Sequence, residues 1–278
     1  MEIISIRQNF VVLLQFGFLL ETAWRLCKMA SVLQKVLSFA QHTLSKTPHK
    51  DIHKHVSSLK ELVKNLKCED VAFDKRILQD NTKFTYSPRS HDAPVTYVHV
   101  CENEAFSAGV FIVRNGARLP LHDHPNMSGL LKMIHGQAAV QCYTETNEEV
   151  PDFVKEEVPV WKQDNIKRVV ASPEHVIDTN SEPCVLTPSD SNIHEIRATG
   201  GVAAFFDILF PPYDQISGSR LCRYYKLVWP STVQERSKNL EEQYLIEIPQ
   251  PRDFWCNSLP FEGLSILPSE APSICDNL

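Results

Sequence analysis

The sequence predicts an all-β fold, a barrel or sandwich of short strands with two helices packed outside it. From about residue 94, short apolar segments alternate with Gly, Pro, Asn and Asp, a pattern typical of β-sandwiches and barrels. Apolar residues instead recur at helical spacing over 32–44 and 51–67, which predicts two amphipathic helices. The expected strands are 95–101, 106–113, 129–134, 137–143, 166–172, 184–187, 193–197, 201–209, 221–229 and 243–248.

The composition is that of an ordinary soluble globular protein. Of the 278 residues, 43% are apolar and 22% are charged, which is close to the average for such proteins. The net charge is −6, and no long basic block interrupts the chain, so a nucleic-acid-binding role has no electrostatic basis. The eight cysteines are scattered without a Cys-x-x-Cys pair, which indicates free thiols and predicts a cytoplasmic protein.

An apolar run over residues 10–20 allows three interpretations of the N-terminus. The run is shorter than the roughly 20 residues of a membrane span, so no membrane association is expected. It resembles the apolar core of a signal peptide with Arg7 ahead of it, but a poor cleavage site follows. Because a fresh amphipathic pattern begins at Met29, the favoured interpretation is an added extension over residues 1–28.

The remaining chain divides by pattern into three segments. An acidic stretch over 145–157 lacks periodicity, which predicts a solvated surface loop within the β region. Trp161 and Trp229 are expected to pack in the core or at the rim of the barrel. The expected segments are a helical N-terminal segment over 29–92, the β domain over 93–260, and a C-terminal tail over 261–278, with the chain after Pro249 wrapping the barrel.

The functional hypothesis depends on Leu119–Pro125, which reads Leu-Pro-Leu-His-Asp-His-Pro. Side chains alternate along a strand. If these residues lie on a strand, His122 and His124 share one face while Asp123 points the other way. Neutral imidazoles held side by side are good ligands for a divalent transition metal. The alternative is a pair of exposed or hydrogen-bonded histidines that bind no metal.

A metal site would need a third ligand from another strand. His194 follows a turn and begins a short expected strand, whereas His135 and His175 are expected at the surface or in supporting positions. A second His-x-His pair, His53 and His55, lies in an expected helix, where the two side chains cannot share a face. The candidates in the β region are His99, His135, His175 and His194.

These motifs resemble those of the cupin family, which implies a double-sheet β-barrel (jelly roll) with a metal inside it. The matching positions are Gly116, His122, His124 and Gly136 in the first motif, and Pro188 and His194 in the second. Gly129 stands where the family has a glutamate ligand. Three neutral histidines would leave a ferrous ion its full +2 charge, which an anionic thiolate substrate could offset.

The closer resemblance is to the thiol dioxygenases, the cupins that include cysteamine (2-aminoethanethiol) dioxygenase and the plant cysteine oxidases. It extends over most of residues 29–258 and leaves residues 1–28 outside. The segments that carry it, in order, are Met29–Ser31, Leu119–Pro125, Cys184–Pro188, Ala203–Asp214, Cys222–Tyr225 and Asp253–Cys256.

The resemblance implies one Fe(II) per chain, held by His122, His124 and His194, and O₂ as the second substrate. Both oxygen atoms would enter a terminal thiol and give a sulfinic acid. The implied substrates are cysteamine, which would give hypotaurine, and the N-terminal cysteine of peptides or proteins. Oxidation of such cysteines would feed an oxygen-dependent degradation signal. A monomer is expected.

Four further residues are functional candidates from the same resemblance. Asp207 interrupts an apolar strand, where a carboxylate is costly unless paired, so it could orient the substrate ammonium together with Tyr213. The alternative for Asp207 is an internal hydrogen bond to a backbone amide. Cys222 and Tyr224 match the positions of a thioether cross-link in the family, and on a strand they would share a face. The alternative is a free buried cysteine beside an ordinary tyrosine.

Two other functional classes remain open from the sequence. The chain could be a cupin with different metal-dependent chemistry, such as an isomerase or a dioxygenase of a non-thiol substrate. It could also be a catalytically silent cupin that serves as a binding module, although such a protein would have no reason to keep three histidines.

Overall fold

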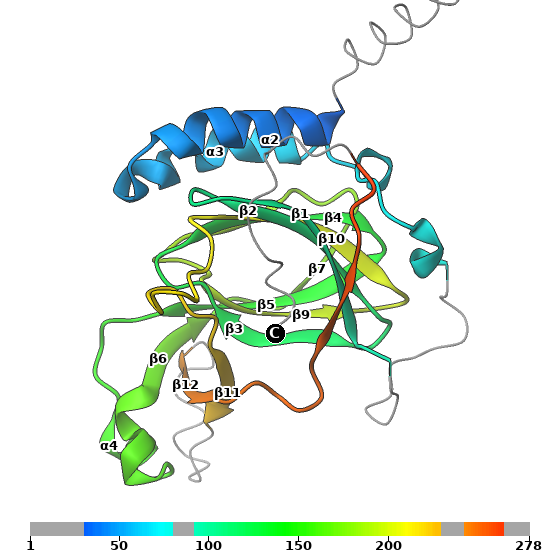
Figure 1. The fold of residues 1–278 in the computed structure, drawn as a ribbon. Helices are drawn as coiled ribbons and strands as arrows, with labels where there is room; N and C mark the ends of the chain where they lie inside the picture. The colour runs from blue at the N-terminus through cyan, green and yellow to red at the C-terminus, as the bar shows by residue number, and fades with distance from the viewer. Residues whose placement is uncertain (1–30, 80–91, 229–241, 264–278) are drawn as a thin grey trace, which may run out of the picture.

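The computed structural model describes residues 31–79, 92–228 and 242–263, and these form a double-sheet β-barrel with helices outside it (Figure 1). One sheet has six strands in the order β13-β1-β2-β10-β4-β8. The other has seven strands in the order β6-β12-β11-β3-β9-β5-β7. The predicted all-β cupin-type class is therefore confirmed.

The strand bounds follow the sequence pattern closely, with three strands added. The six-stranded sheet contains β1 (Val95–Glu102), β2 (Ser107–Val113), β4 (Ser128–His135), β8 (Cys184–Leu186), β10 (Ala203–Phe210) and β13 (Cys256–Leu259). The seven-stranded sheet contains β3 (Arg118–Asp123), β5 (Gln137–Glu145), β6 (Ile166–Ala171), β7 (His175–Asp178), β9 (Ile193–Ala198), β11 (Tyr224–Val228) and β12 (Glu242–Ile248). The strands absent from the expected set are β3, β7 and β13.

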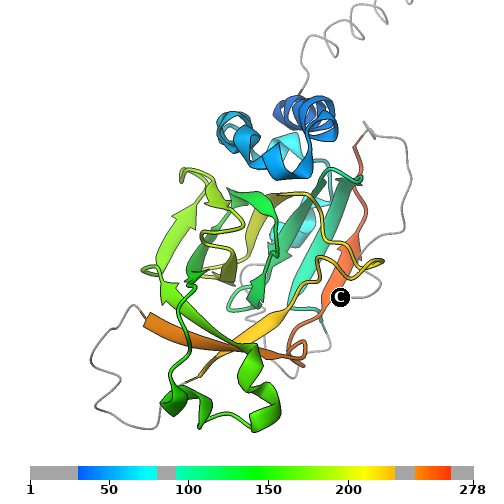
Figure 2. The same ribbon diagram turned by 90° about the vertical axis from the view of Figure 1, so that its left-hand side faces the viewer.

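The N-terminal helices cover the outer face of the six-stranded sheet (Figures 1 and 2). Helix α2 (Val32–Thr43) begins with a capping box in which Ser31 and Gln34 satisfy each other's backbone N–H groups. The second predicted helix is only partly α-helical, because it consists of the 3₁₀ helix η2 (His49–His55) followed by α3 (Val56–Val63). The η2 turn begins after Pro48 with an i→i+3 bond from the Asp51 N–H.

The alternation along β10 explains how one strand serves two cores. Phe206, Ile208 and Phe210 pack with the helices on the outer side of the sheet, whereas Ala203 and Phe205 face the space between the two sheets. Because strand side chains alternate, Asp207 shares the inner face with Phe205. The carboxylate of Asp207 therefore points into the barrel, as the sequence pattern predicts.

The acidic stretch is more ordered than the loop that was predicted. It contains the short helix α4 (Asp152–Lys155), and buried Val154 and Val158 pack against Ile166, Tyr244 and Ile246. The segment lies across the barrel from α2 and α3 (Figure 1). The prediction for Trp161 is wrong: it lies in the 3₁₀ helix η5 (Val160–Asn165) and is 80% exposed.

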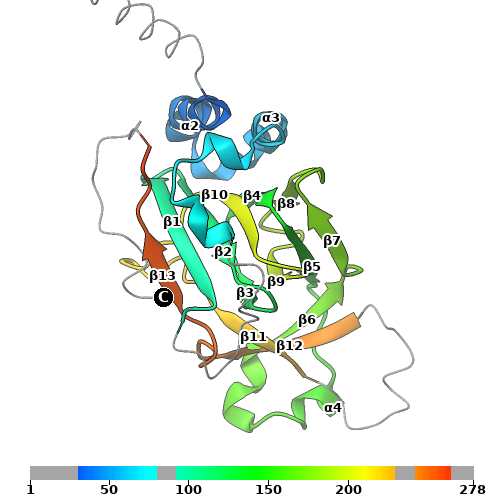
Figure 3. The same cartoon turned by 90° about the vertical axis from the view of Figure 1, so that its right-hand side faces the viewer.

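The chain after Pro249 closes the edge of the six-stranded sheet. Strand β13 pairs in parallel with β1, with Cys256 opposite Val95, and lies beside it in Figure 3. Two further 3₁₀ helices, η3 (Cys68–Asp70) and η4 (Lys75–Leu78), follow α3 in the chain.

Several predictions concern residues outside the described ranges. These are the extension over 1–28 with its apolar run, the packing of Trp229, and most of the 261–278 tail. The domain boundaries at 28, 92 and 260 stay predictions. Within the described ranges, no helix combines the length and apolar character that crossing a bilayer requires.

Candidate metal centre

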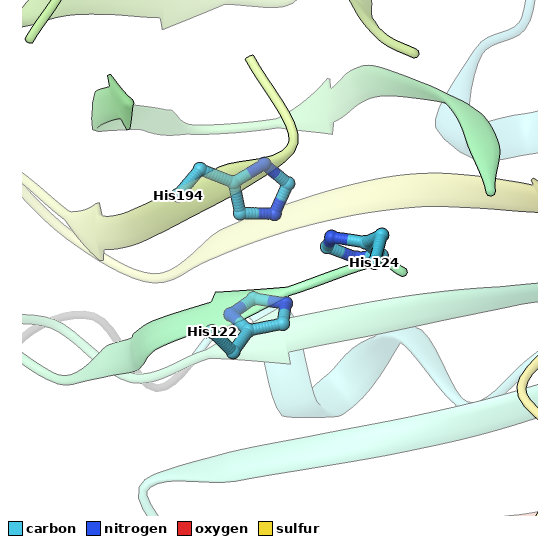
Figure 4. A group of neighbouring side chains, drawn as sticks. All are labelled: His122, His124 and His194. Atoms are coloured by element: carbon cyan, nitrogen blue, oxygen red, sulfur yellow. The ribbon is translucent and has the colours of Figure 1, made fainter. Parts of the chain in front are cut away.

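Two neighbouring strands of the seven-stranded sheet bring the three predicted histidines together (Figure 4). His122 lies on β3, and its direct antiparallel partner on β9 is His194. His124 follows the end of β3. The register of the β3–β9 pairing shifts between Leu119 and His122. The end of β3 that carries His122 therefore does not continue the ladder that begins at Arg118.

The three imidazoles form a compact group. Ring centroids are 4.7 Å apart for His122 and His124, and 4.8 Å apart for each of these with His194. Their available nitrogens all lie within 4.8 Å of one another. Three nitrogens bound at about 2.1 Å to one ion would be about 3–3.5 Å apart, so small side-chain adjustments would close the group around a metal.

Backbone carbonyls orient two of the three rings. His122 Nδ1 lies 2.8 Å from the Pro120 carbonyl oxygen, and His124 Nδ1 lies 3.1 Å from the Asn192 carbonyl oxygen. A carbonyl can only accept, so Nδ1 must carry the proton in each ring and Nε2 keeps its lone pair. This is the arrangement in which a histidine is prepared to bind a metal through Nε2.

Asn192 is a supporting residue that the sequence analysis missed. Its side-chain oxygen accepts from the His124 N–H at 3.1 Å, and its amide nitrogen donates to the His124 carbonyl at 2.8 Å. Asn192 therefore fixes both the backbone and the ring of His124, across 68 positions of sequence. A polar residue two positions before His194 was the only available sequence clue.

Burial keeps the three imidazoles neutral. It lowers the pKa of His122 to about 4, and it lowers the pKa values of His124 and His194 well below the usual value. Mutual repulsion between the rings adds to this effect at His124 and His194. Neutral imidazole is the form that binds metals, so this donor set fits a divalent transition ion.

Among the described residues no carboxylate joins this group. A Cβ placed on Gly129, where many cupins have glutamate, would lie 2.7 Å from Leu209 Cδ2 and 3.2 Å from Leu186 Cγ. The position is therefore filled by packing. Neither His175, which is exposed at the start of β7, nor His135 joins the group, and neither do His53 and His55.

The histidines form one wall of a cavity between the two sheets. Aromatic rings supply much of the opposite side, with Phe111 and Phe205 stacked at 5.4 Å between centroids. No lysine or arginine is found among the described residues that line the cavity. Its polar lining beyond the three histidines consists of Ser107, Asp207, Tyr213, Gln215, Cys222, Tyr97 and Tyr224.

Asp207 faces this cavity without a protein partner in the described part of the chain. The internal hydrogen bond considered from the sequence is therefore not formed. Burial raises the pKa of the carboxyl to about 7. A buried carboxylate without a donor is unfavourable, so a cationic group entering the cavity would stabilise its charged form.

Tyr213 stands at the same cavity with its hydroxyl engaged. The hydroxyl donates to the Asp123 carbonyl at 2.7 Å, and the ring lies 5.6 Å from the ring of His124. Burial, with a further contribution from Cys222, raises its pKa well above the usual value.

Cys222 and Tyr224 lie together beside the histidines. Tyr224 begins β11 directly opposite His122, and continuing the antiparallel register places Cys222 opposite His124. Burial raises the pKa of the Cys222 thiol to about 12, opposed by hydrogen bonding with the hydroxyls of Tyr213 and Tyr224. The shared face expected from the sequence is present, although Cys222 itself precedes the strand.

Comparisons with known proteins identify the family of the chain. Residues 62–266, well over half of the chain, match the PCO_ADO family. The 2-aminoethanethiol dioxygenase of Mus musculus is 35% identical over 258 residues, covering 86% of this chain and 98% of that protein. The human enzyme of the same name is 35% identical and covers 77% of this chain and 82% of its own. Plant cysteine oxidase 1 of Arabidopsis thaliana is 29% identical, covering 61% of this chain and 54% of that protein. The chain therefore belongs to the PCO_ADO family of thiol dioxygenases.

Proposed function

We propose that this protein is a ferrous-iron thiol dioxygenase that oxidises cysteamine, or the N-terminal cysteine of peptides and proteins, to the sulfinic acid. The observation that carries the proposal is the pairing of two features in one cavity. Three neutral histidines offer a metal site on one wall, and the unpartnered Asp207 carboxylate faces the same space.

The donor set supports iron chemistry at His122, His124 and His194. A ferrous ion bound there would supply the Lewis acidity and the redox activity that dioxygen chemistry on a thiol requires. Because the described residues add no anionic ligand, the site would retain a +2 charge and favour a substrate that binds as an anion, such as a thiolate.

Charge in the cavity supports an aminothiol as substrate. Asp207 would accept a hydrogen bond from the substrate ammonium, and Tyr213 can offer an oxygen lone pair beside it. The cavity has no lysine or arginine among its described residues to hold a carboxylate, and Asp207 would repel one. Cysteamine has no carboxylate, and in an N-terminal cysteine the carboxyl carbon is part of an amide.

The overall reaction balances without another reductant. The thiol R–SH and O₂ give R–SO₂H, so the sulfur loses four electrons and the dioxygen gains four as two S–O bonds form. With cysteamine the product is hypotaurine. With protein N-termini the product would mark the chain for oxygen-dependent degradation, which suits a cytoplasmic monomer. Cys68, Cys101, Cys142, Cys184 and Cys222 are free thiols, consistent with a reducing compartment.

The Cys222–Tyr224 pair is proposed to form a thioether during turnover. The bond would join Cys222 Sγ to the ring carbon beside the Tyr224 hydroxyl, with loss of the S–H and C–H bonds. Two electrons and two protons would pass to dioxygen and give hydrogen peroxide. Intact mass after turnover should fall by two hydrogens, and an unchanged mass would contradict this part of the proposal.

The deciding experiment measures oxygen uptake by iron-loaded protein with cysteamine and with an N-terminal-cysteine peptide. Uptake with the sulfinic acid as product supports the proposal, and His194→Ala should abolish it along with bound iron. Metal content separates the alternatives. About one iron per chain with turnover is expected, while zinc or no metal with an inert protein would favour another cupin chemistry or a silent binding module.

A further inference from the structure

Asp123 lies between two candidate metal ligands, but its carboxylate points away from them. The residue is only 4% exposed, and it does not line the cavity. Its Oδ1 accepts from the Arg223 backbone N–H at 2.9 Å, and its Oδ2 accepts from the Tyr225 hydroxyl at 2.8 Å. Both carboxylate oxygens therefore accept hydrogen bonds from the segment that carries Cys222 and Tyr224.

The backbone of Asp123 makes two more hydrogen bonds to the same region. Its N–H donates to the Arg223 carbonyl at 3.1 Å, and its carbonyl accepts from the Tyr213 hydroxyl at 2.7 Å. In a regular antiparallel hydrogen-bonded pair, the two residues exchange both N–H···O=C bonds. Here a carboxylate oxygen replaces the Asp123 carbonyl in that exchange, and this leaves the carbonyl free for Tyr213.

This substitution of acceptors fixes three cavity residues from one position. Arg223 is held at both its N–H and its carbonyl, and its neighbours in the chain are Cys222 and Tyr224. Tyr213 is held through its hydroxyl. An apolar residue at 123 would leave the Arg223 N–H and the Tyr225 hydroxyl without these acceptors, and an unmade hydrogen bond at a part-buried or buried group is unfavourable.

We infer that Asp123 is a positioning residue, which holds Cys222, Tyr224 and Tyr213 in place against the three histidines. It does so through hydrogen bonds and without contact with substrate. The geometric part of this inference needs no metal, and its consequence for turnover rests on the proposed function. Other side chains serve less well, because two opposed acceptor oxygens on a short side chain are needed at once.

The first test measures the reactivity of individual cysteines in metal-free protein. Iodoacetamide labelling followed by peptide mapping should show slow reaction at Cys222 in the wild type, because desolvation raises the pKa of its thiol to about 12. Asp123→Ala should raise the Cys222 rate at least tenfold. Cys101 and Cys142, which are buried in β1 and β5, should react as slowly as before. Arg118→Ala, an exposed change on the same strand, is the matched control and should leave Cys222 unchanged.

Two gentler variants keep the inference testable if Asp123→Ala fails to fold. Asp123→Asn retains an oxygen for the Arg223 N–H and should raise the Cys222 rate less than threefold. Tyr225→Phe removes only the partner of Oδ2 and should give an increase between those of Asp123→Asn and Asp123→Ala. An unchanged Cys222 rate in Asp123→Ala and Tyr225→Phe, or an equal rise at Cys101 and Cys142, would overturn the inference.

The second test separates this inference from the proposed function. In iron-loaded protein, Asp123→Asn and Tyr225→Phe should bind iron as the wild type does but accumulate the two-hydrogen mass loss more slowly. If the wild type neither consumes oxygen nor loses this mass, the proposed function fails while the labelling result still decides the role of Asp123. If the wild type turns over and the labelling pattern is unchanged, only the role of Asp123 is wrong.

Discussion

Asp207 on β10 lies directly opposite Gly109 on β2, so no side chain from that neighbour covers or neutralises the carboxylate. The space above Gly109 is taken by Tyr97, whose Cε2, Cζ and hydroxyl oxygen would be 2.3–2.4 Å from a Cβ at this position. The glycine therefore leaves room for the side chain of Tyr97 from β1. The result is an acidic group that faces a cavity with many aromatic side chains in its lining.

The pH dependence of substrate affinity should follow the ionisation of Asp207. Burial raises its pKa to about 7, whereas an aliphatic ammonium stays charged to about pH 10. Raising the pH from 6 to 8 therefore converts most of Asp207 to the charged form that binds the ammonium. KM for cysteamine should fall about tenfold over this range.

Asp207→Asn provides the control for that measurement. The amide cannot ionise, so KM should be high and nearly independent of pH between 6 and 8, while cysteamine still binds through its thiol. Oxygen-uptake kinetics at several pH values would measure both proteins. The same tenfold change in the variant would show that Asp207 is not the titrating group.

Metal affinity should depend on Asn192 although it is not a ligand. Asn192→Ala removes the two side-chain hydrogen bonds that hold the His124 backbone, and so disturbs the carbonyl that orients the ring. Loss of such outer partners typically weakens metal binding 10–100-fold. Competition with a chelator would measure the affinity for iron. Glu195→Gln, beside His194 but in an exposed ion pair with Arg118, should change it less than threefold.

The absence of a charged carboxylate on the substrate should matter for kcat/KM as much as the presence of the ammonium group. Because the described cavity lining offers no lysine or arginine, free cysteine should be at least tenfold poorer in kcat/KM than cysteine methyl ester or cysteine amide. These three compounds share the aminothiol and differ only in the carboxyl group. Equal kcat/KM values for all three would contradict the proposed charge selection.

A glutamate introduced at position 129, where the common cupin motif has one, should not become a metal ligand. Gly129→Glu would place its Cβ 2.7 Å from Leu209 Cδ2, and the rest of the side chain would need space that Leu209 and Leu186 occupy. Overpacking of this kind typically costs about 1–3 kcal/mol, so thermal unfolding should occur at lower temperature. Iron content per folded chain should not rise, whereas a gain in iron affinity would show that the glutamate reaches the metal.

Local sequence patterns were sufficient where one strand or helix decides the outcome. The period-two pattern of β10 placed Asp207 correctly on the inner face, and the same rule separated Asp123 from His122 and His124. They were insufficient for short elements such as β7 and β13, which have four residues each and expose half of them. Such segments lack enough apolar residues to show a period.

The supporting contacts of the site could not be found from local patterns at all. Asp123 meets Arg223 and Tyr225 across 100 and 102 positions of sequence. No periodicity links residues so far apart, and only the pairing of β3 with β11 brings them into contact. The prediction for Trp161 failed for a related reason. Its place on an exposed 3₁₀ helix depends on how the 145–165 segment packs on β6 and β12.

The parallel pairing of β13 with β1 also bears on how the protein is made. By the time a ribosome has translated as far as residue 200, the growing chain already contains His122, His124 and His194. It still lacks Phe254, which lines the cavity, and the last strand of the six-stranded sheet. During synthesis the three imidazoles are therefore complete as a set before the enclosure that would shield them from bulk solvent. A messenger RNA truncated between the codons for His194 and Phe254 would encode the three histidines without the complete cavity.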